Sequence, residues 1–483
     1  MRKGAITNIL VIIDLNIFLY ANIFFYFRLK GNQIKLLLIS LLLYLQNYLF
    51  LLFFKSNFEF SLLEFLTLFS VVSLFSKSRY FKTLLVLLQS LYLIHFIFIS
   101  YFGNQILYTD IYLFFTHIEE TFESLALLYE IVLYPLVITS ATLFAALYIR
   151  YEKSKVPTFA LSLFLIFSVM IQDIFYDASL SLAKEGVKSI FLKNEKRSVE
   201  VNGQRNILPL LKADNNIILV IGESMRSREN LKERYEIFEN YTYKTIAGGA
   251  TNTDVAVPLL INGGISPQKI NLEHNLFLLA KKNGYKTSFI TAQNEKSLKY
   301  IELYLHREHI DDFKILGSRD DKDLIHNLQN ISLEDNNLIV LQMQGEHSPY
   351  IYYENYDRGD SIELRYHKSM SYSNAVLKQL IEHVNNQSKK PFIFIFLSDH
   401  GEFIGENGKT GHNRFEKEIY SVPLVLHSNL ETYVEKLKNH NDIYELIYYY
   451  LGYAKEFKLQ ERDKIRVYGT MITEEDGYID IDM

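Results

Sequence analysis

Side chains that bind metals follow three apolar runs in the second half of this 483-residue sequence. Glu223 comes directly after NIILVIG, His347 comes shortly after NLIVLQM, and the pair Asp399–His400 follows PFIFIFLS. Each of these residues alone would be read as a helix cap or a solvated side chain. Together, carboxylates and neutral imidazoles are the ligands of catalytic zinc sites, and manganese accepts the same ligands. The sequence therefore predicts a catalytic metal site with one coordination position left open.

The elements that must position these residues alternate along the chain. Short β-rich runs at 216–222, 286–291, 337–343, 391–397 and 422–427 are separated by helical patterns such as 274–283 and 371–386. Nearly continuous apolar strands alternating with helices predict an α/β domain with a central, mostly parallel sheet covered on both faces. In such sheets the ligand site lies beyond the carboxyl ends of the strands, where the metal-type residues occur.

Two other patterns in this half are rejected as sites. Gly408-Lys409-Thr410 resembles the end of a phosphate-binding loop, but Phe403 stands where that motif requires its first glycine. His306 and His309 are three residues apart in a charged stretch with a helical pattern, which predicts a solvated helix face.

The first part of the chain has a different composition. Residues 1–177 hold 23 of the 105 Asp, Glu, Lys and Arg residues. Runs long enough to cross a bilayer need about 20 apolar residues, and the candidates are 5–27, 34–54, 60–76, 83–102, 131–150 and 157–177. The run 5–27 could instead be a signal peptide, but it is too long and lacks a small-residue cleavage site.

Basic residues in the short loops predict the orientation of these spans. They cluster in alternate loops, at Arg28, Lys30 and Lys35, at Lys77, Arg79 and Lys82, and at Arg150, Lys153 and Lys155. We therefore expect these loops in the cytoplasm and the C-terminal part outside. Arg2 and Lys3 favour five spans over six. The predicted organisation is a helical transmembrane domain over 1–177, a connector over 178–210 and a catalytic domain over 211–483.

Composition excludes several classes of function. The absence of cysteine excludes disulfides, thiolate catalysis and thiolate metal sites. The net charge of −5 argues against electrostatic binding to nucleic acid. Thr116 and Glu120 lie in an amphipathic run over 103–130. This run predicts a helix that lies on the outer face of the membrane that the spans cross.

Four sequence blocks carry a resemblance to a known family. They are IGES at 221–224, TNTDVAVP at 251–258, GEHSP at 345–349 and SDHGEFIGENGKTGH at 398–412. The last block matches S-D-H-G-E-x-x-G-E-N-G-x-x-x-H without a gap. On these blocks the second half resembles the alkaline phosphatase/sulfatase superfamily. The whole chain resembles the bacterial inner-membrane phosphoethanolamine transferases that modify lipopolysaccharide.

The resemblance implies a role for each matching residue. Thr253 would be the nucleophile, with Thr251 and Ser224 as alternatives, although a threonine before an apolar run is also typical of a helix N-cap. The residues that would hold zinc are Glu223, Thr253, Asp399 and His400. His347 and His412 would bind the phosphoryl group or a second metal, and one of them could act as general acid. Lys299 would also bind the phosphoryl group, and Thr116 and Glu120 would contact the donor headgroup.

The resemblance also implies a reaction and a location. The donor would be phosphatidylethanolamine, the acceptor lipid A or the lipopolysaccharide core, and the enzyme a monomer of the inner membrane with its catalytic domain in the periplasm. A phosphoglycerol transferase using phosphatidylglycerol and a scaffold without catalysis are the alternatives. A formylglycine sulfatase is disfavoured because C/S-x-P-x-R is missing. The chain departs from the family at Gly249 and Leu259, where cysteines are usual, at Glu295, where an asparagine is usual, and at Ala256, where a serine is usual.

Overall fold

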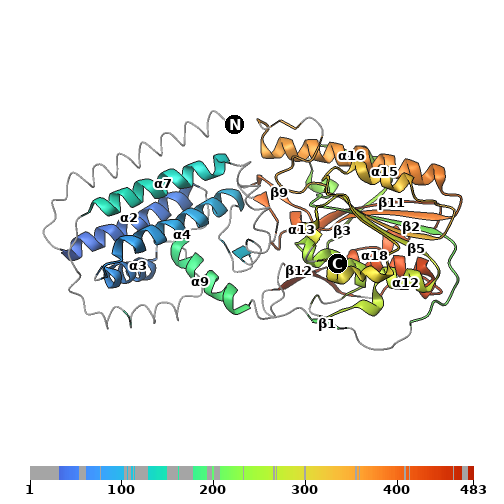
Figure 1. Cartoon of the computed structure of the whole chain (residues 1–483), viewed down its shortest axis with the longest axis horizontal. Coiled ribbons are helices and arrows are strands. Elements are labelled where there is room, and N and C mark those ends of the chain that lie inside the picture. Colours follow the sequence, from blue (N-terminus) through green and yellow to red (C-terminus); the bar gives the residue numbers. More distant parts are fainter. Residues whose placement is uncertain are drawn as a thin grey trace. The chain divides into compact units, whose positions relative to one another are not determined.

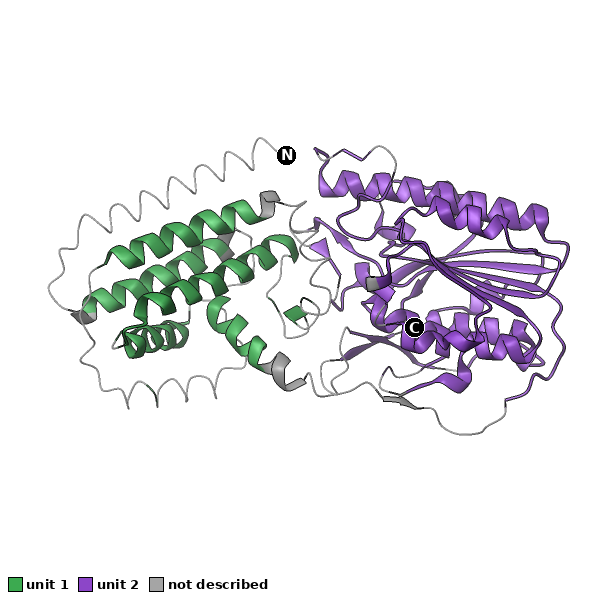
Figure 2. Cartoon of the chain, viewed as in Figure 1, with its two compact units in different colours: residues 1–194, 407–409 green, residues 195–406, 410–483 purple. Residues whose placement is uncertain are grey.

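The computed structural model of the protein divides into two compact units. The first unit comprises residues 1–194 with 407–409, and the second comprises 195–406 with 410–483 (Figure 2). The structure describes residues 32–53, 61–76, 78–102, 129–149, 178–192, 198–200, 207–231, 233–264, 269–298, 301–353, 359–406, 410–412, 414–460, 462–469 and 477–482, together with 106, 110, 111, 114, 162, 267, 356 and 357.

The described part of the first unit is helical. Its helices are α2 (Asn32–Phe53), α3 (Leu62–Phe75), α4 (Phe81–Phe102), α7 (Tyr129–Tyr148) and α9 (Ala178–Leu192). The first four correspond to the predicted runs 34–54, 60–76, 83–102 and 131–150. Among the described residues, α4 is long and apolar enough to cross a membrane, whereas the apolar stretches of α2, α3 and α7 are shorter. The predicted run 5–27 lies outside the described residues, as does almost all of 157–177.

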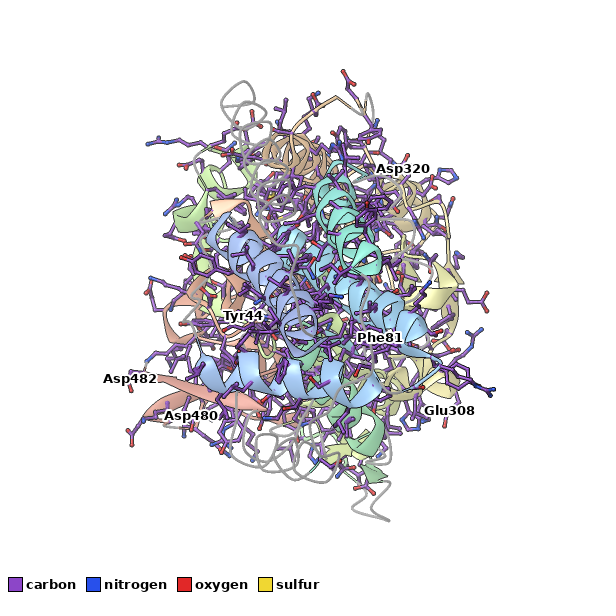
Figure 3. The ribbon with its side chains drawn as sticks, turned by 90° about the vertical axis from the view of Figure 1, so that its left-hand side faces the viewer. Tyr44, Phe81, Glu308, Asp320, Asp480 and Asp482 are labelled. Carbon is purple, nitrogen blue, oxygen red and sulfur yellow. The ribbon has the colours of Figure 1, made fainter. Side chains whose placement is uncertain are left out.

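Polar and apolar side chains in this unit are distributed unusually. Tyr44 and Phe81, labelled in Figure 3, belong to the aromatic and aliphatic cluster between the helices. Polar side chains such as Glu64 and His95 are also buried, whereas apolar ones such as Leu133 are exposed and Phe144 is 75% exposed. Polar groups inside and apolar groups outside are the reverse of a water-soluble bundle.

The second unit is built around a seven-stranded sheet in the order β3-β11-β8-β2-β7-β5-β6. Neighbouring strands are parallel from β8 to β6, and β11 runs antiparallel to both β8 and β3. The strands are β2 (Asn216–Gly222), β3 (Thr242–Ala247), β5 (Lys286–Thr291), β6 (Asp312–Ile315), β7 (Asn337–Gln342), β8 (Phe392–Ser398) and β11 (Ser421–Ser428). The predicted mostly parallel sheet is therefore confirmed, with β3 and β6 as strands that the sequence pattern did not indicate.

Helices cover both faces of this sheet (Figure 1). Alternate residues of β2 enter two hydrophobic cores, with Ile217 and Leu219 on one face and Ile218 and Val220 on the other. The first core is closed by α11 (Thr253–Asn262), α12 (Leu276–Lys282) and α18 (His440–Tyr448), and the second by α15 (Lys322–Gln329) and α16 (Ile362–Gln387). Both faces are buried, which explains why the strands read as continuous apolar runs.

Smaller elements complete the second unit. Short helices are α10 (Glu236–Glu239), α13 (Glu295–Leu298), α14 (Glu302–Leu305) and α17 (Lys417–Tyr420). Three two-stranded sheets pair β1 (Ser198–Glu200) with β4 (Lys269–Asn271), β9 (Phe403–Ile404) with β10 (Thr410–Gly411), and β12 (Lys464–Tyr468) with β13 (Tyr478–Asp482). The pair β9–β10 follows the end of β8, so it lies beside the predicted site.

Candidate functional site

The register of two central strands brings the predicted carboxylates together. β2 and β8 are parallel and pair Gly222 with Ser398, so Glu223 and Asp399 each come one residue later. Adjacent strands lie about 4.8 Å apart, and both side chains are almost fully buried. Two carboxylates thus share one dry space at the carboxyl edge of the sheet, as the strand pattern predicted.

The turn after β2 fixes the orientation of both carboxylates. Ser224 has a φ of 58°, in the left-handed region that few residues other than glycine adopt. In this conformation its backbone N–H donates to Asp399 Oδ1 at 3.1 Å, and its hydroxyl donates to Glu223 Oε1 at 3.0 Å. The strained backbone therefore supplies hydrogen bonds that hold the two acids in place.

Thr253 is the first residue of α11, and its hydroxyl lies against these acids. The side chain of Asn252 caps the helix by accepting from the Asp254 N–H at 2.9 Å. Thr253 Oγ1 donates to Asp399 Oδ2 at 2.6 Å and lies 3.1 Å from Glu223 Oε2. The helix start thus delivers a hydroxyl to the paired carboxylates, at the positive end of the α11 helix dipole.

His400 completes this group. Its Nδ1 lies 2.9 Å from the Gly401 carbonyl, which requires Nδ1–H to donate and leaves a lone pair on Nε2 in the neutral imidazole. That Nε2 lies 3.3 Å from Thr253 Oγ1 and 3.5 Å from an oxygen of each carboxylate. Burial acts to lower the pKa of His400, but the charges of Asp399 and Glu223 outweigh burial and raise it.

These residues fit a divalent metal ion. One ligand atom from each of Glu223, Asp399 and His400 lies within 4.8 Å of the others, and all three residues are buried. Burial, reinforced by the charge of Asp399, raises the pKa of Glu223 to about 7. Two buried carboxylates without a cation are electrostatically costly, and a divalent ion would offset that cost.

Two further predicted histidines lie next to this centre. The ring centroids of His412 and His400 are 4.2 Å apart, and His412 Nδ1 lies 3.6 Å from Glu402 Oε1. Burial and the neighbouring His400 hold the pKa of His412 well below its ordinary value. His347 is close enough to interact electrostatically with Glu223 and His412, and its Nδ1 lies 2.7 Å from the Ser348 carbonyl. Both can therefore present an imidazole to a group bound at Thr253.

Gln293 is a site residue that the sequence reasoning missed. Its Nε2 donates to Glu223 Oε2 at 3.1 Å and to the Met343 carbonyl at 3.2 Å, and its Oε1 accepts from Gln342 at 3.3 Å. Gln293 comes two residues after the strand that was predicted at 286–291. The rule that located Glu223 and Asp399 at strand ends would have found it if amides had been considered.

Two more buried acids, Glu402 and Asp321, lie close to the site. Glu402 belongs to the SDHGE block, and burial raises its pKa to about 7 against the opposing effect of His400. Asp321 accepts from the backbone N–H groups of Gln344 at 2.6 Å and Gly345 at 3.0 Å, which fixes the loop that carries His347. No sequence signal pointed to Asp321, because its partners are backbone groups.

The structure brings together Glu223, Thr253, His347, Asp399, His400 and His412. Three other predicted site residues, Lys299, Thr116 and Glu120, lie outside the described residues. Of the two alternative nucleophiles, Ser224 donates to Glu223, whereas the Thr251 hydroxyl is buried and has no hydrogen-bond partner among the described residues. The geometry at Thr253 therefore distinguishes it from both alternatives.

Comparison of the sequence with known proteins gives two findings. Residues 215–453 match the sulfatase family. The phosphoethanolamine transferase EptA of Helicobacter pylori is 25% identical over 264 residues, which are 46% of this chain and 49% of that protein. The chain thus spans about half the length of this curated relative.

Two of the solved structures that match the chain are phosphoethanolamine transferases. One is the integral membrane protein lipooligosaccharide phosphoethanolamine transferase A (EptA) of Neisseria meningitidis, with 14% identity, a TM-score of 0.58, and coverage of 87% of this chain and 96% of that one. The other is the C-terminal periplasmic domain of phosphoethanolamine transferase EptC of Campylobacter jejuni. It has 19% identity, a TM-score of 0.43, and coverage of 53% of this chain and 92% of that one.

Proposed function

We propose that this chain, a member of the alkaline phosphatase/sulfatase superfamily, transfers phosphoethanolamine from phosphatidylethanolamine to lipid A or the lipopolysaccharide core. The observation that carries the proposal is the Thr253 hydroxyl, which lies within 3.3 Å of Glu223, Asp399 and His400. This is an arrangement for a nucleophile bound to a metal.

Zinc is the metal that we propose for this centre, with manganese as the alternative. Two carboxylates, one imidazole and a hydroxyl make a four-ligand set of the kind that zinc accepts. When bound, zinc would lower the pKa of the Thr253 hydroxyl and polarise a phosphoryl oxygen. The residues that would hold it are Glu223, Thr253, Asp399 and His400.

The chain's own residues then account for a two-step transfer. In the first step a bond forms between Thr253 Oγ1 and the donor phosphorus, the bond from phosphorus to the diacylglycerol oxygen breaks, and the proton lost by the Thr253 hydroxyl ends on the diacylglycerol oxygen. In the second step an acceptor oxygen bonds to the phosphorus, the bond from phosphorus to Thr253 Oγ1 breaks, and Thr253 Oγ1 takes up the proton that the acceptor hydroxyl loses. His412 is neutral at pH 7 and can take the proton of the acceptor hydroxyl. His347 and the positive end of the α11 helix dipole support the phosphoryl oxygens.

We place the first unit in the inner membrane as a multi-pass domain and the second unit in the periplasm. The apolar helix α4, the exposed apolar side chains of the first unit and its buried polar groups support this placement. Both proposed substrates are lipids, so an anchored domain would confine the search for them to the membrane surface. We expect Thr116, Glu120 and Lys299 to contribute to donor binding.

Mass spectrometry of lipid A and core from a Gram-negative host tests this proposal. The host should lack its own phosphoethanolamine transferases and should express the parent, Thr253→Ala or Thr251→Ala. We expect a phosphoethanolamine adduct with the parent and with Thr251→Ala, whose hydroxyl contacts none of the metal-type residues. We expect none with Thr253→Ala.

A phosphoglycerol adduct would show that the donor is phosphatidylglycerol rather than phosphatidylethanolamine. An adduct that persists with Thr253→Ala would overturn the assignment of the nucleophile. If the folded parent protein produces no adduct, this result would argue for the alternative of a scaffold without catalysis.

A further inference from the structure

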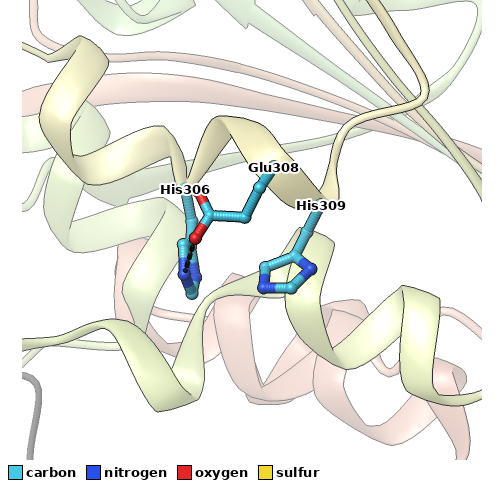
Figure 4. A group of neighbouring side chains, drawn as sticks. All are labelled: His306, Glu308 and His309. Atoms are coloured by element: carbon cyan, nitrogen blue, oxygen red, sulfur yellow. Dashed lines mark ion pairs between the residues drawn. The ribbon is translucent and has the colours of Figure 1, made fainter.

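A second group of metal-type side chains lies in the turn between α14 and β6. His306, Glu308 and His309 fall within four residues, and one ligand atom from each lies within 4.8 Å of the others. Their side chains gather on one side of the turn (Figure 4). The sequence pattern predicted a solvated helix face here. The structure instead has a half-buried His306 followed by a short 3-10 helix, Arg307–His309.

We propose that this turn binds a second divalent metal ion of the zinc type, separate from the centre at Thr253. Two imidazoles and one carboxylate are a complete protein ligand set for zinc, with a position left for water. His306 Nε2 lies 3.0 Å from Glu308 Oε1, and the ring centroids of His306 and His309 are 4.3 Å apart. Ligands of a tetrahedral zinc lie about 3.3 Å apart, so small side-chain rotations would suffice.

The backbone of the turn is fixed in place before any metal binds. On its near side, the carbonyl of Tyr304 accepts from Asn262 and Asn275, each at 3.1 Å. On its far side, the His309 carbonyl accepts from the Thr287 hydroxyl at 2.7 Å. His306 itself is held in the left-handed region with a φ of 56°. Closing a chelate within four anchored residues costs little conformational entropy.

The position of the turn makes this site independent of catalysis. It directly precedes β6, the edge strand of the sheet, and contacts the start of β5 at Thr287. It therefore lies at the amino ends of the parallel strands, whereas Thr253 lies at their carboxyl ends. Five or six residues of extended strand separate the two edges by about 20 Å.

We expect this site to bind its metal more weakly than the catalytic centre. Lys281 and Lys282 are close enough to His309 to oppose a further positive charge. His306 Nδ1 is buried without a hydrogen-bond partner among the described residues. A ligating histidine usually donates its second ring N–H to a partner, and loss of that partner typically weakens binding by 10–100-fold.

Metal content tests the proposal directly. The full chain in detergent micelles is dialysed against buffer that holds a fixed, low concentration of free zinc and is then analysed for zinc per chain by mass spectrometry. We expect His309→Gln and Glu308→Gln each to hold one equivalent less than the parent. The matched control is His326→Gln on the exposed face of α15, which should hold the same amount as the parent. Equal zinc in the parent and in both ligand variants would overturn the proposal.

A cobalt titration gives a second readout that does not depend on the proposed transferase activity. In the Glu223→Gln background, added Co²⁺ should produce the visible absorption of a low-coordinate site, and adding His309→Gln should remove it. No absorption in that background would show that the three side chains form only an ion pair and a ring contact. The lipid products test the transferase proposal at Thr253, whereas zinc content and cobalt absorption test the metal site at His306, Glu308 and His309. Failure of one proposal can therefore be distinguished from failure of the other.

Discussion

At the residue scale, the Thr253 hydroxyl lies 2.6 Å from Asp399, 3.1 Å from Glu223 and 3.3 Å from His400. Strand ends in the sequence pointed to Glu223, Asp399 and His400, whereas Thr253 was predicted through the motif resemblance. Gln293 was not predicted from the sequence, because an amide has no charge that would single it out. Its role arises only from a hydrogen bond to Glu223.

Gln293→Leu should weaken zinc binding at the catalytic centre. The leucine fills a similar volume but removes the donor that orients Glu223 Oε2, and loss of such a partner typically costs 10–100-fold in metal affinity. A competition titration with a chromogenic chelator measures the change. Gln379→Leu on the exposed face of α16 is the matched control. Unchanged affinity in the Gln293 variant would mean that Glu223 is positioned without this contact.

Stability of the metal-free protein should fall as the pH rises from 5 to 8. Burial raises the pKa of Glu223, Glu402 and Asp321 to about 7 each. Between their ordinary values and pH 7, the folded protein binds protons that the unfolded chain has released, so this stabilisation is lost progressively as the pH rises to about 7. His412 and His440, whose pKa values burial lowers, act in the opposite direction over the same range. The three acids outnumber these two histidines, so we expect a melting temperature at least about 3 °C higher at pH 5 than at pH 8.

Zinc should have the opposite pH dependence, because its ligands must lose their protons to bind it. The rise in melting temperature on adding zinc should be larger at pH 8 than at pH 5. Differential scanning calorimetry with and without zinc measures both trends. A metal-free melting temperature that increases steadily up to pH 8 would contradict the raised pKa values.

At the element scale, strand register and close backbone contacts decide the shape of the site. Parallel pairing of β2 with β8 places Glu223 beside Asp399, and the loop after β7 packs against the turn after β2. The apolar runs predicted five of the seven strands. β3 and β6 were missed because their residues are partly exposed and mix polar with apolar side chains.

Gly345→Ala should disrupt the catalytic centre through its backbone. Gly345 has a φ of 52°, and an added Cβ would lie 2.9 Å from both N and O of Glu223. Left-handed strain costs about 1–2 kcal/mol, and Glu223 must also move. We expect lower stability to urea and at least about tenfold weaker zinc binding.

Gly317→Ala is the control for backbone strain alone. Gly317 has a φ of 66°, and a Cβ there would meet nothing within 4 Å. It should lose stability by about 1–2 kcal/mol without any change in zinc affinity. Equal zinc affinities in the two glycine variants would show that contact with Glu223 does not shape the site.

At the scale of the whole molecule, the chain joins a helical unit with polar groups inside to an α/β unit with two apolar cores. The motif resemblance to the alkaline phosphatase/sulfatase superfamily is confirmed by the match over residues 215–453. The predicted boundaries at 177 and 210 remain predictions. The helix α9 lies within the predicted connector.

Cysteine labelling tests the proposed topology, because the chain contains no cysteine that would interfere. Single variants Gln329→Cys in the second unit and Tyr80→Cys before α4 both place a thiol at an exposed position. With the outer membrane permeabilised and the inner membrane intact, an impermeant maleimide should label Gln329→Cys and spare Tyr80→Cys. Both should react after lysis. The reverse pattern would place the α/β unit in the cytoplasm.

The sequence by itself determined the class of the sheet and five of its seven strands, and it predicted the residue types of the candidate metal centre. Those features follow from local periodicity and from side-chain chemistry, which a chain carries without folding. The tertiary structure decided which groups support them. Gln293, Asp321 and the left-handed Ser224 act through contacts between residues distant in sequence. The same holds for the turn at His306, whose side chains converge because buried neighbours fix its backbone.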